Sequence, residues 1–272
     1  MSKVLLVGCG HMGSALADAW LEFKSYSITI VDPFNYKNLK KIYYKKKIQL
    51  LNETPNQKQI LNFDIIIFAV KPQVSKKVIK EYSDFNLKKN VMIGSIIAGK
   101  KINFYNSAFK KSIQIVRIMP NMPALIRRGI TCFVSNRHLN DSNKKKINEL
   151  FLKVGKTVWF KDENQIDIAT AISGSGPGYV FTIIDAFEKS SQKMGLSKKI
   201  SRELVLSTLL GSVKLMEATK KEPDVLANSI SVKGGTTEAG IRVLKKNNLN
   251  KTIYNTLKAA YEKATRLGKS ND

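Results

Sequence analysis

The sequence is poor in the residues that build disulfide and metal sites. Its 272 residues include two cysteines, Cys9 and Cys132, and two histidines, His11 and His138. Two cysteines give no disulfide framework, so we expect the chain to reside in a reducing cytoplasm. The scarcity of cysteine and histidine also argues against a dedicated zinc site, and we expect no bound metal.

Long apolar runs are missing as well. No stretch approaches the ~18 consecutive apolar residues of a membrane span, and a strand is expected directly after Met1–Lys3, which leaves no room for a signal peptide. We therefore expect no membrane association. Hydrophobic residues still make up 43% of the chain and charged residues 25%, as is typical of globular proteins. A length of 272 residues fits one large domain or two ordinary ones.

Acidic residues are also scarce. The chain carries 21 acidic and 46 basic residues, for a formal net charge of +25, and most of the basic residues are lysines in short clusters. A nucleic-acid-binding protein would concentrate arginine and exposed aromatic residues on one surface. We interpret the charge as a solvated lysine-rich surface that attracts anionic cofactors and substrates, and we expect no nucleic-acid partner.

The first part of the chain alternates between apolar runs and helical segments. This alternation predicts a doubly wound α/β sheet of the Rossmann type over residues 1–161. Runs without polar interruption are typical of parallel strands covered on both faces. The expected strands are 4–7, 27–32, 64–70, 91–97, 112–119, 129–135 and 157–160, with helices around 37–46, 74–82 and 101–109 and one from Asp141.

The pattern changes near residue 162. From there to residue 272 the apolar spacing is helical, which predicts an all-helical second domain. The segment 201–218 is apolar around much of its circumference. A small helical domain alone covers little of such an apolar surface, so we expect a homodimer or a higher oligomer. The alternative is that this segment is a core helix of a monomer.

A glycine-rich loop follows the first strand. The segment "GCGHMG" places Gly8, Gly10 and Gly13 in the G-x-G-x-x-G spacing between a strand and a helix. In that context the first glycine permits the turn, the second lets a pyrophosphate approach the backbone, and the third lets the helix pack closely on the strand. We therefore expect a dinucleotide cofactor against this loop, whose variable positions are Cys9, His11 and Met12.

The end of the second strand bears on the choice of cofactor. Asp32 stands where a carboxylate accepts hydrogen bonds from the adenine ribose and repels a 2′-phosphate. This favours NADH, although Lys37, Lys40 and Lys41 nearby could accommodate NADPH. The alternative is that Asp32 only initiates a turn before Pro33.

Taken together, these segments resemble the pyrroline-5-carboxylate reductase family nearly end to end. The resemblance rests on motifs that occur in the family order: "GCGHMG" (8–13), "AVKPQ" (69–73), "RIMPNMPALIRRGIT" (117–131), "AISGSGPGYVF" (171–181), "KMGL" (193–196) and "KGGTTEAG" (233–240). It implies NAD(P)H-dependent reduction of 1-pyrroline-5-carboxylate to L-proline by two interlocking subunits.

The resemblance also implies roles for single residues. On the cofactor side it implies contacts from Asn56, Val70, Lys71, Pro72 and Ala98, and on the substrate side a contact from Glu163. For Asn56 the alternative is a helix-terminal role after Pro55, and for Lys71 and Pro72 a strand end.

Two further segments are assigned to the substrate. Ser173 and Ser175 stand in "SGSGP", either as pocket residues or as a simple helix break. In "KGGTT", glycines and hydroxyls precede a helix, so the amides of Gly235 and Thr236 can hold a carboxylate at the positive end of the helix dipole. By the resemblance, Thr237 hydrogen-bonds the ring nitrogen of the imine and is the catalytic candidate.

Three residues depart from the family pattern around this motif. They are Val232, Lys233 and Glu238, and Glu238 would repel a substrate carboxylate if it pointed inward. Two alternatives stay open: a related imine or 3-hydroxy-acid reductase of the same architecture, and a noncatalytic dinucleotide-binding protein. Against the hydroxy-acid branch, no lysine clearly occupies the general acid or base position on a helix of the second domain.

Overall fold

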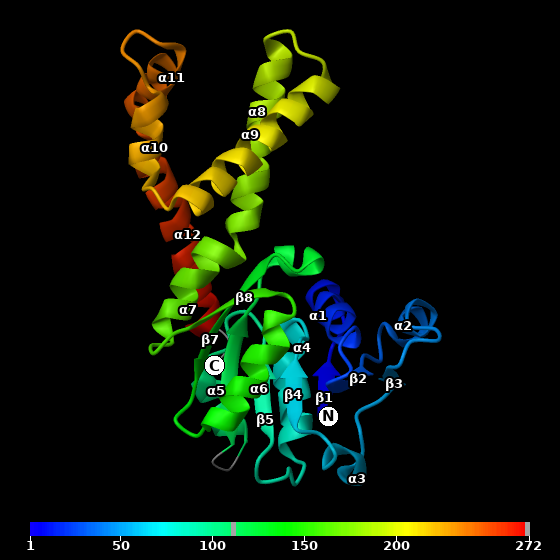
Figure 1. Ribbon diagram of the computed structural model, residues 1–272. Coiled ribbons are helices and arrows are strands. Elements are labelled where there is room, and N and C mark those ends of the chain that lie inside the picture. The colour runs from blue at the N-terminus through cyan, green and yellow to red at the C-terminus, as the bar shows by residue number, and fades with distance from the viewer. Residues whose placement is uncertain (110–112, 270–272) are drawn as a thin grey trace. The chain divides into compact units, whose positions relative to one another are not determined.

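A computed structural model describes residues 1–109 and 113–269 of the chain. The chain divides into two compact units, of which the first comprises Met1–Ser175 and the chain from Ala260 onward, and the second comprises Gly176–Ala259 (Figure 1). Each unit is described by itself.

An eight-stranded sheet forms the centre of the first unit, with the strand order β3-β2-β1-β4-β5-β6-β7-β8. The strands from β3 to β6 pair in parallel, β7 runs antiparallel to β6, and β8 is parallel to β7. The bounds are β1 Ser2–Val7, β2 Tyr26–Val31, β3 Gln49–Leu51, β4 Ile65–Phe68, β5 Met92–Ser95, β6 Gln114–Met119, β7 Gly129–Ser135 and β8 Gly155–Trp159.

Helices cover both faces of the sheet because successive strand side chains point to opposite sides. One core contains Leu6 and Ile67 with side chains of α1 and α6, and the other contains Leu5 and Ile66 with side chains of α4 and α5. The helical segments of this unit are α1 His11–Leu21, α2 Tyr36–Ile42, α3 Gln57–Ile60, α4 Pro72–Ser83, α5 Ile102–Ala108, the 3-10 helix η1 Met122–Ile126, α6 Asp141–Leu152, α7 Asn164–Ala169 and the π-helical turn η2 Thr170–Gly174.

The predicted Rossmann-type sheet is confirmed, with differences in detail. The short strand β3 was not predicted, and the antiparallel direction of β7 was not specified by its apolar run. Residue 112, the start of one expected strand, lies outside the described residues. The boundary predicted after residue 161 follows the last strand, but the compact unit continues to Ser175 because α7 buries Ile166 and Ala169.

The second unit is helical, as predicted. Its helices are α8 Gly176–Lys193, α9 Lys198–Thr219, α10 Pro223–Ile230, α11 Thr236–Lys246 and the first part of α12 Leu249–Lys269. Arg202 of α9 donates two hydrogen bonds to the largely buried carboxylate of Glu188 in α8, at 3.0 and 3.2 Å. The segment 270–272 of the predicted domain lies outside the described residues. None of the helices in the described ranges has the length and apolar character needed to cross a membrane.

Candidate active site

The glycine loop lies between the end of β1 and the start of α1, and steric contacts explain its first and third glycines. Gly8 has φ +93°, and a Cβ there would lie 2.9 Å from the backbone of Ala69. A Cβ on Gly13 would lie 2.6 Å from the carbonyl oxygen of Gly8. A Cβ on Gly10 would meet no described atom within 4 Å, so the space above this residue is open. The loop therefore fits a pyrophosphate that approaches Gly10 at the N-terminus of α1.

Asp32 braces this loop from the end of β2. Its Oδ2 accepts a hydrogen bond from the Cys9 amide at 2.8 Å, and its Oδ1 accepts one from the Asn35 amide at 3.0 Å. The carboxylate thus performs the turn-forming role that the sequence left open. It also places a negative charge beside the glycine loop, where the adenine ribose of a dinucleotide binds in this fold.

Basic and aromatic side chains surround a cavity beyond Asp32. The cavity has a volume of about 1090 Å³, and Phe34 at its edge is 97% exposed. It is lined by Pro33, Phe34, Tyr36, Lys37, Lys40, Lys41, Tyr44 and Asn52. The cationic lining is suited to a phosphate group, so the surroundings of Asp32 contain features that favour each of the two nicotinamide cofactors.

The segment after β4 lies against the glycine loop. The Ala69 amide donates to the Val7 carbonyl at 2.8 Å, and a Cβ on Gly8 would lie 2.9 Å from Cγ1 of Val70. Lys71 is the N-cap residue of α4 and Pro72 is its first residue. Ala69 and Val70 are therefore brought together with the glycine loop, and Lys71 and Pro72 follow them at the start of α4.

Ala98 and Asn56 occupy other loops of the same unit. Ala98 is exposed in the turn after β5, the strand next to β4. Asn56 forms a capping box at α3, in which its side chain accepts from the Gln59 amide and the Gln59 side chain accepts from the Asn56 amide, both at 2.9 Å. Asn56 therefore caps a helix, as the alternative interpretation of this residue expected. Its contact with a cofactor stays a prediction.

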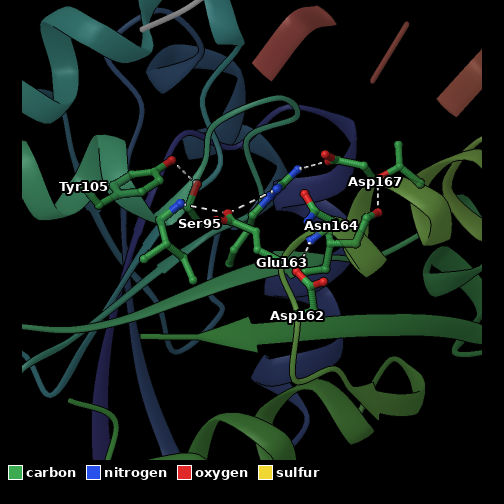
Figure 2. A network of polar contacts seen from close by, with 10 residues as sticks. Ser95, Tyr105, Asp162, Glu163, Asn164 and Asp167 are labelled. Carbon is green, nitrogen blue, oxygen red and sulfur yellow. Dashed lines mark hydrogen bonds and ion pairs between the residues drawn. The ribbon is translucent and has the colours of Figure 1, made fainter. Parts of the chain in front are cut away.

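Glu163 lies in a network of polar contacts with other residues of the first unit (Figure 2). Its Oε1 accepts from the Ile102 amide at 2.8 Å and from Nη1 of Arg117 at 3.1 Å. Nη2 of the same arginine donates to Asp167 at 2.6 Å. Sequence reasoning missed Arg117 and Asp167, although a charged residue inside the apolar strand 112–119 is a signal that could have indicated a buried ion pair.

Asn121 is a second residue that sequence reasoning did not single out. Its Nδ2 donates to the Ser173 carbonyl at 3.1 Å, and its Oδ1 accepts from the Ile130 amide at 2.9 Å. Ser173 and Ser175 belong to a wide turn, in which the Ser175 amide donates to the Thr170 carbonyl at 2.8 Å. Asn121 thereby fixes the "SGSG" segment to the corner between β6 and β7.

The "KGGTT" motif forms the start of α11 in the second unit. Gly234 has φ +77°, and a Cβ on Gly235, the N-cap residue, would lie 2.9 Å from Cγ2 of Val232. Glu238 turns back on its own helix, where Oε2 accepts from the Gly234 amide at 2.8 Å and lies 3.4 Å from Nη2 of Arg242. The carboxylate of Glu238 is thus paired with the Gly234 amide just before the helix and with Arg242 in the same helix.

The remaining departures and threonines of this motif are less enclosed. Val232 and Lys233 are exposed, Thr236 is exposed and Thr237 is half-buried. Residues Gly235, Thr236 and Thr237 belong to one unit and the other candidate residues to the other unit.

The cysteine of the glycine loop is buried. Burial, together with the negative charge of Asp32, raises the pKa of the Cys9 thiol to about 12. The thiol is therefore protonated at neutral pH and acts as a buried loop residue. Within residues 1–109 and 113–269, no group of three or more His, Cys, Asp or Glu side chains could hold a metal ion.

These features define a class of protein. The first six strands form a parallel sheet in the order 3-2-1-4-5-6. The glycine loop has no room for a side chain at its first and third glycines and is open at its second. Both features are typical of a Rossmann-fold, NAD(P)-dependent oxidoreductase. Comparison with known families agrees: residues 3–99 match the family described as NADP oxidoreductase, coenzyme F420-dependent, and residues 163–267 match pyrroline-5-carboxylate reductase dimerisation.

Full-length relatives identify the family. The chain is 30% identical to pyrroline-5-carboxylate reductase of Synechocystis sp. over 97% of each chain. The crystal structure of Plasmodium falciparum pyrroline carboxylate reductase with NADP bound has a TM-score of 0.86 at 30% identity, covering 98% of both chains. A pyrroline-5-carboxylate reductase from Coxiella burnetii has a TM-score of 0.87 at 28% identity, also with 98% coverage of both. The chain belongs to the pyrroline-5-carboxylate reductase family, and the resemblance seen in its motifs is confirmed.

Proposed function

We propose that this chain reduces 1-pyrroline-5-carboxylate to L-proline, with NAD(P)H held by the first unit and the substrate held chiefly by the start of α11. Membership of the family supports the reaction. The observation that carries the cofactor assignment is the glycine loop, whose open Gly10 is flanked by two glycines that tolerate no side chain.

The chain's own residues bind and orient the reactants. We assign Gly8 to Gly13, Val70 to Pro72, Ala98 and Asn56 to the cofactor. Ser173 and Ser175 are assigned to the substrate side. A bound NAD(P)H supplies the hydride that adds to the C=N carbon of the ring. An imine that arrives already protonated needs no strong protein acid. Positioning of the two reactants can then account for a large part of the rate enhancement.

The start of α11 suits a small carboxylate. The amides of Gly235 and Thr236 stand at the N-terminal end of an 11-residue helix, where backbone N–H groups and the helix dipole favour an anion. Glu238 is held by the Gly234 amide and lies near Arg242, which reduces its repulsion of that anion. We assign the hydroxyl of Thr237 to the ring nitrogen, where negative charge would otherwise develop during reduction.

We also propose a cofactor preference, an oligomeric state and a cellular compartment for the protein. The fixed carboxylate of Asp32 favours NADH, with the lysine-lined cavity as the feature that admits NADPH. The match to a dimerisation family and the exposed apolar residues of α9 support a homodimer. The described cysteines are free and buried, which fits a reducing compartment, the cytoplasm.

One assay tests the proposed reaction. Purified protein is mixed with 1-pyrroline-5-carboxylate and either NADH or NADPH, and loss of reduced-cofactor absorbance is followed together with proline formation. We expect one proline per cofactor oxidised, with NADH the better substrate. The variant Thr237→Ala is expected to lower kcat/KM by about 10²-fold, the scale of a lost transition-state hydrogen bond, with an unchanged Tm. Full kcat/KM in that variant would remove Thr237 from the mechanism.

A further inference from the structure

The ion-pair network around Arg117 supports an inference that builds on the proposed function. The side chain of Arg117 is 5% exposed, and the carboxylates that flank it are 24% exposed in Glu163 and 4% exposed in Asp167. Arg117 comes from β6, and both acidic residues come from the segment that follows β8. A buried guanidinium needs such partners, because an unpaired buried charge carries a large desolvation penalty.

One branch of this network leads to the cofactor side. Oε1 of Glu163 accepts from the Ile102 amide at the start of α5, directly after the turn that contains Ala98. Tyr105 of the same helix shares a hydrogen bond of 2.5 Å with Ser95, and Oγ of Ser95 accepts from the Ile97 amide at 3.2 Å. The segment between Ser95 and Ile102 is thus held at both ends by polar contacts, of which the one at Ser95 is buried (Figure 2).

The other branch leads to the substrate side. Asp167 lies in α7, and α7 continues without interruption into the turn Thr170–Gly174. Ser173 of that turn is held in addition by Asn121, which donates to its carbonyl oxygen. A shift of α7 would therefore move the turn that contains Ser173 relative to the sheet.

We infer that Arg117 is a positioning residue that holds the two sides of the active site through two separate partners. Through Glu163 it fixes the turn after β5, which we have assigned to the cofactor, and through Asp167 it fixes the turn that contains Ser173. In this arrangement Glu163 supports the cofactor side and does not contact the substrate. The two carboxylates share one guanidinium but act on different ligands.

Two matched pairs of variants test this division. Glu163→Ala and Asp167→Ala each remove one branch, while Glu163→Gln and Asp167→Asn keep the shape and an oxygen acceptor. The dissociation constant of NADPH and of NADH is measured by fluorescence titration without substrate, and KM for 1-pyrroline-5-carboxylate is measured at saturating cofactor. Thermal unfolding of every variant shows that it is folded.

The expected result is a split between the two branches. Glu163→Ala raises the cofactor Kd about tenfold and changes the substrate KM less than about twofold, as for the loss of one charged hydrogen bond. Asp167→Ala produces the reverse. The amide variants recover most of each loss, and if an alanine variant fails to fold they give the same comparison with smaller shifts.

The opposite results overturn the inference. An unchanged cofactor Kd in Glu163→Ala with a raised substrate KM would make Glu163 a substrate contact. Equal changes of both constants in both alanine variants would show a general loss of structure. If the wild-type protein binds the cofactor but does not reduce the imine, the proposed function fails, whereas the Kd of the Glu163 variants still tests the cofactor branch.

Discussion

The two compact units bury their apolar side chains to very different extents. In the first unit, Leu5, Leu6 and Ile67 are fully buried within cores on both faces of the sheet. Among the described residues of the second unit, Val205 is the one buried hydrophobic side chain, and Leu210 and Val213 are 58% and 53% exposed. The sheet unit therefore contains its own core, whereas the helical unit needs a partner surface to cover it.

The largest expected effect comes from placing charge on the exposed face of α9. Leu210→Lys combined with Val213→Lys should convert the proposed dimer into a monomer, because each buried aliphatic side chain contributes about 1.5–3 kcal/mol in each subunit. Light scattering after size-exclusion chromatography measures the mass. Leu152→Lys, at a residue of α6 that is 49% exposed, is the control and should leave the dimer intact. A dimer that persists in the double variant would show that α9 is not its interface.

A smaller effect is expected inside the self-sufficient sheet unit. Gly13→Ala should lower the free energy of unfolding by about 1–3 kcal/mol, since its Cβ meets backbone with no room to relax. Gly10→Ala is the matched control for folding, because a Cβ there meets no described atom within 4 Å. It should keep the wild-type Tm and raise the cofactor Kd about tenfold or more, consistent with close backbone approach. Normal cofactor binding by Gly10→Ala would contradict the assigned pyrophosphate site.

The choice of cofactor depends on a balance of charges in the same unit. Asp32→Asn removes the charge and keeps an oxygen acceptor, so the ratio of kcat/KM for NADPH to that for NADH should rise about tenfold, the scale of one charged contact. Lys40→Gln should lower kcat/KM for NADPH alone. Steady-state kinetics with both cofactors measure this ratio. An unchanged ratio in Asp32→Asn would show that the carboxylate only stabilises the loop through its hydrogen bonds and does not select the cofactor.

The smallest effect concerns pH and the thiol of the glycine loop. Burial raises the pKa of Cys9 from 9.0 to about 12, so the folded protein retains a proton that the unfolded chain releases. Stability is therefore lost as the pH rises from about 9 towards 12. Denaturant unfolding at pH 8 and at pH 10.5 should show a smaller decline for Cys9→Ala than for wild type. An equal decline would mean that the thiol titrates normally in the folded protein.

Much of the sheet unit could be predicted because its signals are local. Val4 to Val7 and the glycines that follow specify a strand, a turn and a helix start within a few residues. The strand Gln49–Leu51 was missed because it is three residues long and lies at the sheet edge. The direction of Gly129–Ser135 was not predictable, since an apolar run looks the same in parallel and antiparallel pairing.

The site residues could be predicted where backbone geometry requires one residue type. They were harder to predict where the contact joins residues that are far apart in the chain. Gly8 and Gly13 are required by atoms a few residues away or on the neighbouring strand end. Arg117 and Glu163 are 46 residues apart in the chain, and their pairing arises only when β6 meets the segment after β8. Family motifs indicated where chemistry occurs, but not which charged residues hold those motifs in place.

The most direct test is the structure of the protein with an oxidised nicotinamide cofactor and L-proline bound together. We predict the pyrophosphate at Gly10, the proline carboxylate on the amides of Gly235 and Thr236, and the ring carbon within about 3.5 Å of the nicotinamide, a near-attack separation. Proline bound away from the start of α11 in every subunit pairing, or a cofactor bound away from residues 8–13, would contradict it.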